Sequence, residues 1–214
     1  MGEATIIVIL TTSFVVGLSG ALMPGPLLAL TVGETARHGF WSGPLLVLGH
    51  AILELSLVIA LVFGLSKVVG NGLVFSIVGI VGGLVLIYMG YSTIRQGWRS
   101  TGIPTSKAKT ANRMMVVSGI VVSASNPYWL IWWATIGTTY LLWSLKVGAV
   151  GVASFFTGHI FADLIWYTFI SFIIVKGKKL ISNNIYKWFL IVCGLALLGL
   201  GGYFIFSGIK FLVQ

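Results

Sequence analysis

The sequence predicts an all-α integral membrane protein in which six transmembrane helices form two inverted repeats of three helices each. Composition is the first reason: 57% of the residues are hydrophobic and only 8% are charged, whereas soluble domains carry about 25% charged residues. The second reason is a series of six long apolar runs, and the third is a motif that occurs once in each half of the chain. Such a chain is expected to lie in a lipid bilayer.

Six apolar runs cover most of the 214 residues, and each is near or above the roughly 20 residues that a spanning helix needs. The runs extend over about residues 5–33, 41–65, 72–94, 114–143, 147–175 and 185–211. The longest link between them is polar and contains Gly102 and Pro104, as flexible linkers often do. We therefore expect a first three-helix repeat over residues 1–100, a linker over 101–113 and a second repeat over 114–214.

The basic residues favour one side of the predicted membrane. Of the thirteen Lys and Arg residues, ten fall in the links after the first, third and fifth runs, and three fall on the opposite side. The positive-inside rule then places the linker in the cytoplasm and both termini outside. The net charge of +9 does not indicate a nucleic-acid partner, because the basic residues form no patch with stacking aromatics. The single cysteine, Cys193, excludes an internal disulfide and a Cys-x-x-Cys redox pair.

The first apolar run is interrupted by the segment from Gly20 to Pro26. Pro24 and Pro26 lack the amide hydrogens that would bond the carbonyls of Gly20 and Leu22, and Gly25 tolerates non-helical backbone angles, so the helix is expected to break here. Inside lipid, freed backbone groups are tolerated only within protein or beside a wet cavity. The segment therefore indicates a binding site, and the alternative is a simple proline kink.

A Gly-His pair followed by three residues, an acid and Leu occurs once in the second run and once in the fifth. The titratable residues of the two copies are His50, Glu54, His159 and Asp163. Chance is a poor explanation, because the chain has only three histidines and four acidic residues. The pattern therefore predicts an internal repeat, and the second copy must be inverted because three spans per copy is an odd number.

The fourth run is interrupted at a place equivalent to the break in the first. Pro127 is expected to free the carbonyl of Ser123, and Asn126 is a favoured N-cap for the half-helix that follows. Interrupted helices at corresponding places in two inverted halves are the best sequence pointer to the midplane site of a transporter.

The two breaks predict a site for a zwitterion such as an amino acid. The amides of Leu27, Leu28 and Ala29 begin a half-helix whose positive dipole end favours a carboxylate. The carbonyls of Gly20, Leu22 and Ser123 are expected to accept from an ammonium group or to bind a cation.

Each histidine of the repeat lies four residues before an acid, hence on the same face of a helix. A charge inside an apolar run costs on the order of 3 kcal/mol, so Glu54 and Asp163 need partners or a wet cavity. We expect the His–acid pairs to carry a coupling proton or attract a cation. The alternatives are polar pairs that only join helices and a four-ligand site for a divalent metal, which would make the chain a metal exporter. An enzyme is not expected, because no serine or cysteine lies in a nucleophile motif.

Two further groups have an open assignment. Trp129, Trp132 and Trp133 either wall a substrate cavity or face lipid. Glu34 and Arg37 form an interfacial salt bridge or gate the pathway.

The interrupted segments connect the chain to a known family. Its features are six runs in about 210 residues, the Gly-x-x-x-Pro-Gly-Pro motif of Gly20 to Pro26, the following Gly39 and Gly43, and the pair Asn126-Pro127. In these features the chain resembles the LysE/RhtB family of amino-acid exporters, a branch of the lysine exporter superfamily.

This resemblance implies export of an amino acid or a related metabolite across the cytoplasmic membrane of a prokaryote. It implies that the proton gradient drives transport and that the protein is a homodimer, and no cofactor is expected. It also assigns a place in the substrate pathway to Pro24, Gly25, Pro26, Asn126 and Pro127.

Overall fold

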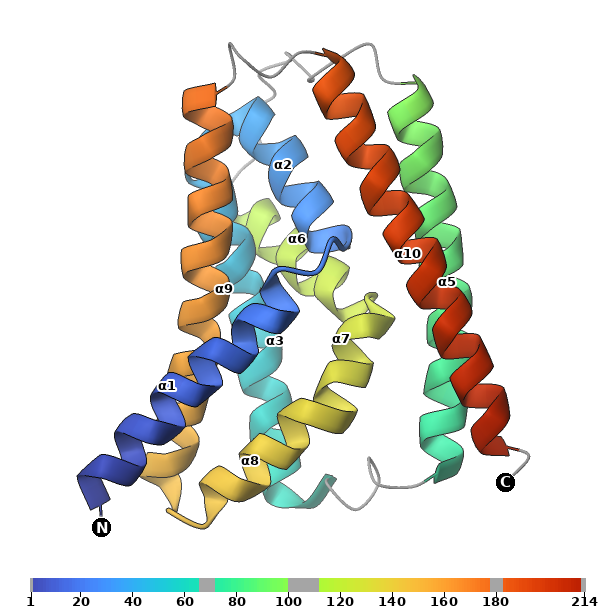
Figure 1. Ribbon diagram of the computed structural model, residues 1–214. Coiled ribbons are helices and arrows are strands. Elements are labelled where there is room, and N and C mark those ends of the chain that lie inside the picture. Colours follow the sequence, from blue (N-terminus) through green and yellow to red (C-terminus); the bar gives the residue numbers. More distant parts are fainter. Residues whose placement is uncertain (1, 66–71, 100–111, 178–182, 213–214) are drawn as a thin grey trace.

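The computed structural model describes residues 2–65, 72–99, 112–177 and 183–212, and these residues form helices and short connections without a strand. Two of the elements, η1 and η2, are π-helical turns. In chain order the elements are α1 (Gly2–Ala21), α2 (Pro26–His38), α3 (Ser42–Ala60), η1 (Leu61–Leu65), α5 (Gly72–Arg99), α6 (Asn112–Ala124), α7 (Pro127–Trp132), η2 (Trp133–Gly137), α8 (Thr138–Leu145), α9 (Ala149–Gly177) and α10 (Asn183–Leu212). They assemble into one bundle with both termini near the same end (Figure 1). The predicted linker lies outside the described residues except for its last two positions.

The bundle contains three to five candidate membrane spans. Three helical stretches are long and apolar enough to cross a bilayer, namely Ser42–Gly64, Ala149–Gly177 and Asn183–Lys210. Two bent helix pairs raise the number to five if each pair counts as one span. The predicted third span, 72–94, lies within the single helix α5, which is not among these five. The all-helical membrane class is thus confirmed, while the count of six spans stays a prediction.

The two helix breaks expected from the proline motifs are present. The axes of Thr5–Ala21 and Pro26–His38 differ by 78°, and those of Asn112–Ala124 and Tyr128–Leu145 differ by 65°. Both breaks lie near mid-height of the bundle (Figure 1). Since each half-helix after a break begins with proline at its first position, the missing amide hydrogen costs that helix nothing.

The backbone angles at Gly25 do not require a glycine, contrary to the expectation from the sequence. Its φ of −134° and ψ of −177° are extended values that any residue adopts. Asn126, which precedes the other half-helix, is extended as well. The chain leaves the helix by straightening, so proline alone accounts for the break.

Helices from the two halves pack against each other in a reciprocal pattern. α1 lies mainly against α9, and α3 lies mainly against α6. The glycine of each Gly-His pair is at the closest approach: a Cβ on Gly49 would collide with the backbone of Val116, and one on Gly158 would collide with the backbone of Leu10. Small residues of this kind let helix backbones approach closely in membranes. The same contacts fix the position of the histidine that follows each glycine.

The remaining long helices, α5 and α10, form a pair of their own. Gly83 faces Gly201, and Gly90 faces Gly194, so the two backbones touch along most of the pair. The pair joins the rest of the bundle at α7, where Tyr128 packs against buried side chains of the pair, and at α2 and α9, which share a buried cluster with Tyr186 and Leu190 of α10. The helices α5 and α10 therefore pack mainly on each other, and α10 also contributes to the core between α2 and α9.

Gly201→Ala is expected to destabilise the protein, because its Cβ would lie 2.7 Å from the carbonyl oxygen of Gly83. Overpacking of this kind costs about 1–3 kcal/mol, which should lower the melting temperature of the purified protein in detergent. Gly202→Ala is the matched control, since nothing lies within 4 Å of its Cβ. Equal melting temperatures for the two variants would contradict this packing.

Candidate functional site

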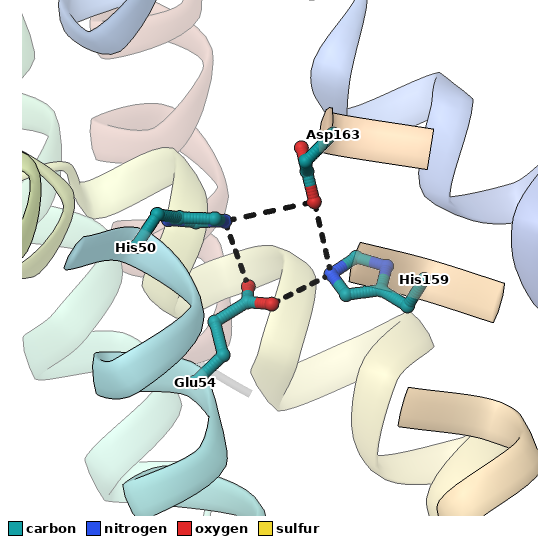
Figure 2. A group of neighbouring side chains, drawn as sticks. All are labelled: His50, Glu54, His159 and Asp163. Carbon is teal, nitrogen blue, oxygen red and sulfur yellow. Dashed lines mark ion pairs between the residues drawn. The ribbon is translucent and has the colours of Figure 1, made fainter. Parts of the chain in front are cut away.

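Four titratable side chains meet inside the bundle, and Figure 2 shows them pointing toward one another. His50 and Glu54 come from α3, and His159 and Asp163 come from α9; we call these four residues the quartet. All four are buried, with exposed fractions between 1% and 7%. The sequence predicted the two pairs within each helix, and it gave the convergence of all four residues into one site as an alternative.

The distances within the quartet show that Glu54 bridges the two histidines. Its Oε1 lies 3.2 Å from Nε2 of His50, and its Oε2 lies 2.9 Å from Nε2 of His159. Oδ2 of Asp163 lies 3.7 Å from Nε2 of both histidines. The shortest contact thus joins α3 to α9.

Two tryptophans hold Glu54 in place. The indole N–H groups of Trp129 and Trp133 both donate to its Oε1, at 2.9 Å and 2.7 Å. An indole N–H only donates, so both bonds use lone pairs of this oxygen. These two tryptophans therefore face the site, which decides the assignment that the sequence left open. The sequence contained a signal for this arrangement. The two tryptophans follow a helix break and are four residues apart, hence on one helix face, and a buried indole N–H needs a hydrogen-bond acceptor.

The third tryptophan and a serine orient the histidines. The ring of Trp132 stacks on the imidazole of His159, with centroids 4.5 Å apart. The hydroxyl of Ser123 is hydrogen-bonded to Nδ1 of His50 at 2.8 Å, which leaves Nε2 of His50 directed at the two carboxylates. Ser123 was expected at the site through its carbonyl, and its side chain makes the contact instead.

Backbone groups at the breaks are less free than the sequence suggested. The carbonyl of Gly20 accepts the amide of Met23 at 3.2 Å, and that of Ser123 accepts the amide of Asn126 at 3.0 Å. The expectation of free carbonyls at these two positions was therefore wrong, because each helix tightens into a final turn that supplies the next available amide.

The N-terminus of α2 follows the expectation only in part. The amide of Ala29 donates to the carbonyl of Gly25 at 3.1 Å, so it is not free as expected. The amides of Leu27 and Leu28 have no hydrogen-bond partner in the part of the chain that the structure describes. At the other break, the side chain of Asn126 caps α7 by accepting the amide of Tyr128 at 3.1 Å, as the sequence predicted.

Two small adjoining cavities connect the quartet with both breaks. One, of about 50 Å³, is lined by all four quartet residues together with Gly20, Leu27, Ser123, Asn126, Tyr128, Trp129, Trp132 and Tyr167. The other, of about 30 Å³, is lined by Gly20, Met23, Pro24, Gly25, Leu27, Asn126, Tyr128, Tyr167, Leu197 and Leu200. Since a water molecule needs about 10–15 Å³ of such space, this closed conformation has room for a few waters.

The remaining predicted site residues are placed less centrally. Leu22 is 49% exposed and lines neither cavity. Pro26 is buried and also lines neither. The side chain of Pro127 lies outside the described part of the chain.

Glu34 forms a separate polar group near the far end of α2. Its carboxylate lies 3.0 Å from Nδ1 of His38 and 3.8 Å from Arg37. None of these residues lines the two cavities. The salt-bridge assignment fits this geometry.

Comparison with known proteins shows the family of the chain. The family model for LysE type translocators matches residues 18–208, which include both helix breaks and the quartet. The chain belongs to the LysE type translocator family. Among curated proteins, the Bacillus subtilis (strain 168) protein named "Putative amino acid efflux protein YcgF" is 25% identical over 197 residues, which cover 92% of this chain and 94% of that protein. No solved structure matches.

Membership of this translocator family, together with the long apolar helices, identifies a multi-pass membrane protein. The quartet accordingly lies on two long apolar helices of a LysE type translocator.

The bond between Trp133 and Glu54 is expected to stabilise the fold. A double-mutant cycle of Trp133→Phe and Glu54→Leu, measured by unfolding in denaturing detergent, should give a coupling energy of about 1 kcal/mol or more. Trp166→Phe is the control, because the indole N–H of Trp166 has no hydrogen-bond partner among the described residues. Additive effects in both cycles would contradict the anchoring role of Trp133.

Proposed function

We propose that the protein exports amino acids or related small zwitterionic metabolites across the cytoplasmic membrane by proton antiport. One observation carries this proposal: the quartet and both helix breaks border the same cavity. Family membership supports a translocator, and the efflux name of the Bacillus subtilis relative supports an amino-acid substrate.

The substrate carboxylate is proposed to bind at the start of α2. The amides of Leu27 and Leu28 are unbonded there, and the positive end of the helix dipole favours an anion. The other break adds the side-chain amide of Asn126, which lines both cavities. The proposed substrate residues are Gly20, Leu22, Pro24, Gly25, Pro26, Ser123, Asn126 and Pro127.

The quartet is proposed to carry the coupling proton and to attract the substrate ammonium group. The two carboxylates have different surroundings: Glu54 accepts two indole N–H bonds, whereas Oδ2 of Asp163 has no hydrogen-bond partner among the described residues. Asp163 is therefore the better candidate for exchange between a proton and an ammonium group, and Glu54 is the fixed anion that keeps the histidines together.

We also propose that the halves are inverted copies with six spans in total. The reciprocal packing supports this, because exchanging the halves converts the contact of α1 with α9 into that of α6 with α3. Both termini lie near one end of the bundle, as an even number of spans requires (Figure 1). Their location outside the cell, and a homodimer, stay predictions.

Asp163→Asn is expected to abolish export driven by a pH gradient, because the amide can exchange neither proton nor charge. Glu54→Gln should have the same effect by removing the anion between the histidines. The measurement is amino-acid transport into proteoliposomes with an imposed pH gradient, and Glu34→Gln serves as the acidic control outside the cavities. Wild-type rates in both quartet variants would refute the coupling role, and no transport of any amino acid by the wild type would refute the function.

Replacing both Pro24 and Pro26 by alanine is expected to restore a continuous helix and remove the free amides at the start of α2. A transported amino acid at about 100 times its Kd stabilises a protein by about 2.7 kcal/mol, and this thermal shift should vanish in the double variant. Pro44→Ala is the control, because Pro44 lies in the first turn of α3, away from the breaks. An unchanged thermal shift in the double variant would show that the proline motif only kinks the helix and does not bind substrate.

A further inference from the structure

The quartet has the atom types of a transition-metal site. Each member offers one ligand atom, an imidazole nitrogen or a carboxylate oxygen, and these four atoms lie within 4.8 Å of one another. Zinc in proteins is bound by such nitrogen and oxygen ligands in a four-coordinate tetrahedral arrangement.

The spacing of the ligand atoms also fits. Bonds of about 2.0–2.2 Å to a tetrahedral zinc ion place its ligands about 3.3–3.6 Å apart. Oδ2 of Asp163 lies 3.7 Å from Nε2 of both histidines, and Oε2 of Glu54 lies 2.9 Å from Nε2 of His159. Shifts of a few tenths of an ångström would bring these three contacts to the required distances, and the most widely separated ligand atoms, up to 4.8 Å apart, must close by about 1 Å.

Three of the ligand atoms have no hydrogen-bond partner among the described residues, although two of them, on Glu54 and His159, form an ion pair at 2.9 Å. Oε2 of Glu54, Nε2 of His159 and Oδ2 of Asp163 are buried and form no hydrogen bond with any described residue. The short contact between Glu54 and His159 therefore lacks the alignment of a hydrogen bond. Ligands of one metal ion have this relation, because their lone pairs point at a common centre rather than at each other.

Residues around the quartet bond to the atoms that are not needed as metal ligands and leave the ligand atoms free to bind an ion. The bond of Ser123 to Nδ1 of His50 directs Nε2 inward, which is how the outer partners of metal-binding histidines act. The indole N–H groups of Trp129 and Trp133 occupy Oε1 of Glu54 and leave Oε2 open. The ring of His159 is held by stacking on Trp132.

We propose that His50, Glu54, His159 and Asp163 together bind one divalent transition-metal ion, with Zn²⁺ as the ion that best matches their atoms. The ion joins α3 to α9 with two ligands from each helix. Metal ligands must be unprotonated, so the ion competes with protons for the same atoms. Zinc should therefore inhibit export. This last consequence rests on the proposed function, whereas the binding itself does not.

The chain contains a matched control for this site. Glu34 and His38 form another His–carboxylate contact, at 3.0 Å and four residues apart on one helix. This pair offers only one histidine and one acid, and it is not part of the four-residue group. A His38→Ala variant thus removes a histidine near a carboxylate without touching the quartet.

The test is equilibrium dialysis of the full, untagged protein in detergent, stripped with chelator and then given ZnCl₂ alone. We expect one Zn²⁺ per chain in the wild type and in His38→Ala. In His159→Ala, which removes a ligand, we expect a loss of affinity greater than the roughly 10- to 100-fold that removal of an outer partner costs. Absence of stoichiometric zinc in the wild type would overturn the proposal. So would unchanged binding in the double variant His50→Ala/His159→Ala, which would mean an adventitious ion only.

Two further measurements keep the test decisive. If His159→Ala elutes as aggregate in size-exclusion chromatography, the near-isosteric Asp163→Asn takes its place with the same criterion. Co²⁺ in place of zinc should give the intense visible absorption of a tetrahedral site, and the weak absorption of an octahedral ion would contradict the geometry. Zinc binding in a protein that transports no amino acid would refute the proposed function and leave the metal site standing.

Discussion

The structure depends on the mutual neutralisation of four titratable groups inside an apolar bundle. A lone charge at the centre of a membrane helix costs on the order of 3 kcal/mol or more, and neither α3 nor α9 could hold its acid there without partners. The short contact of Glu54 with His159 satisfies both helices at once. This contact can form only if α3 and α9 meet at one particular height, so the chemistry of the quartet selects the register of the two helices.

Glycine contacts position the two histidines of the quartet. Gly49 and Gly158 stand directly before the two histidines, and each lies against the backbone of a helix from the other half of the chain. A larger side chain would push α3 away from α6, or α9 away from α1, and so displace the histidine that follows. In each Gly-His pair, the glycine allows the close approach of a neighbouring helix, and the histidine that follows takes part in the quartet. The occurrence of this pair in both halves explains why the quartet draws equally on α3 and α9.

The helix breaks add a polar backbone to the same place. A continuous helix bonds its own amides, but α2 begins inside the bundle and leaves two of them unbonded among the described residues. Asn126 caps the other half-helix, and it also lies beside Gly25 of the first break. A helix start with two unbonded amides and a titratable cluster thus border one small cavity, where we propose that the two ends of a zwitterion bind. The cavity is too small for such a molecule in this conformation, so binding requires the helices around it to separate.

Local chemistry determined a large part of this protein from the sequence alone. Apolar runs fixed the membrane class, prolines fixed the two breaks, and helical periodicity fixed the pairing of His50 with Glu54 and of His159 with Asp163, because each depends on residues within one turn or one helix. Only the tertiary structure decided that Glu54 bridges to His159, that Trp129 and Trp133 face the site, and that the carbonyls of Gly20 and Ser123 are already bonded. These features depend on how separate helices are rotated and shifted against each other. In lipid an apolar face does not determine the rotation of a helix, because lipid and protein interior are similarly apolar.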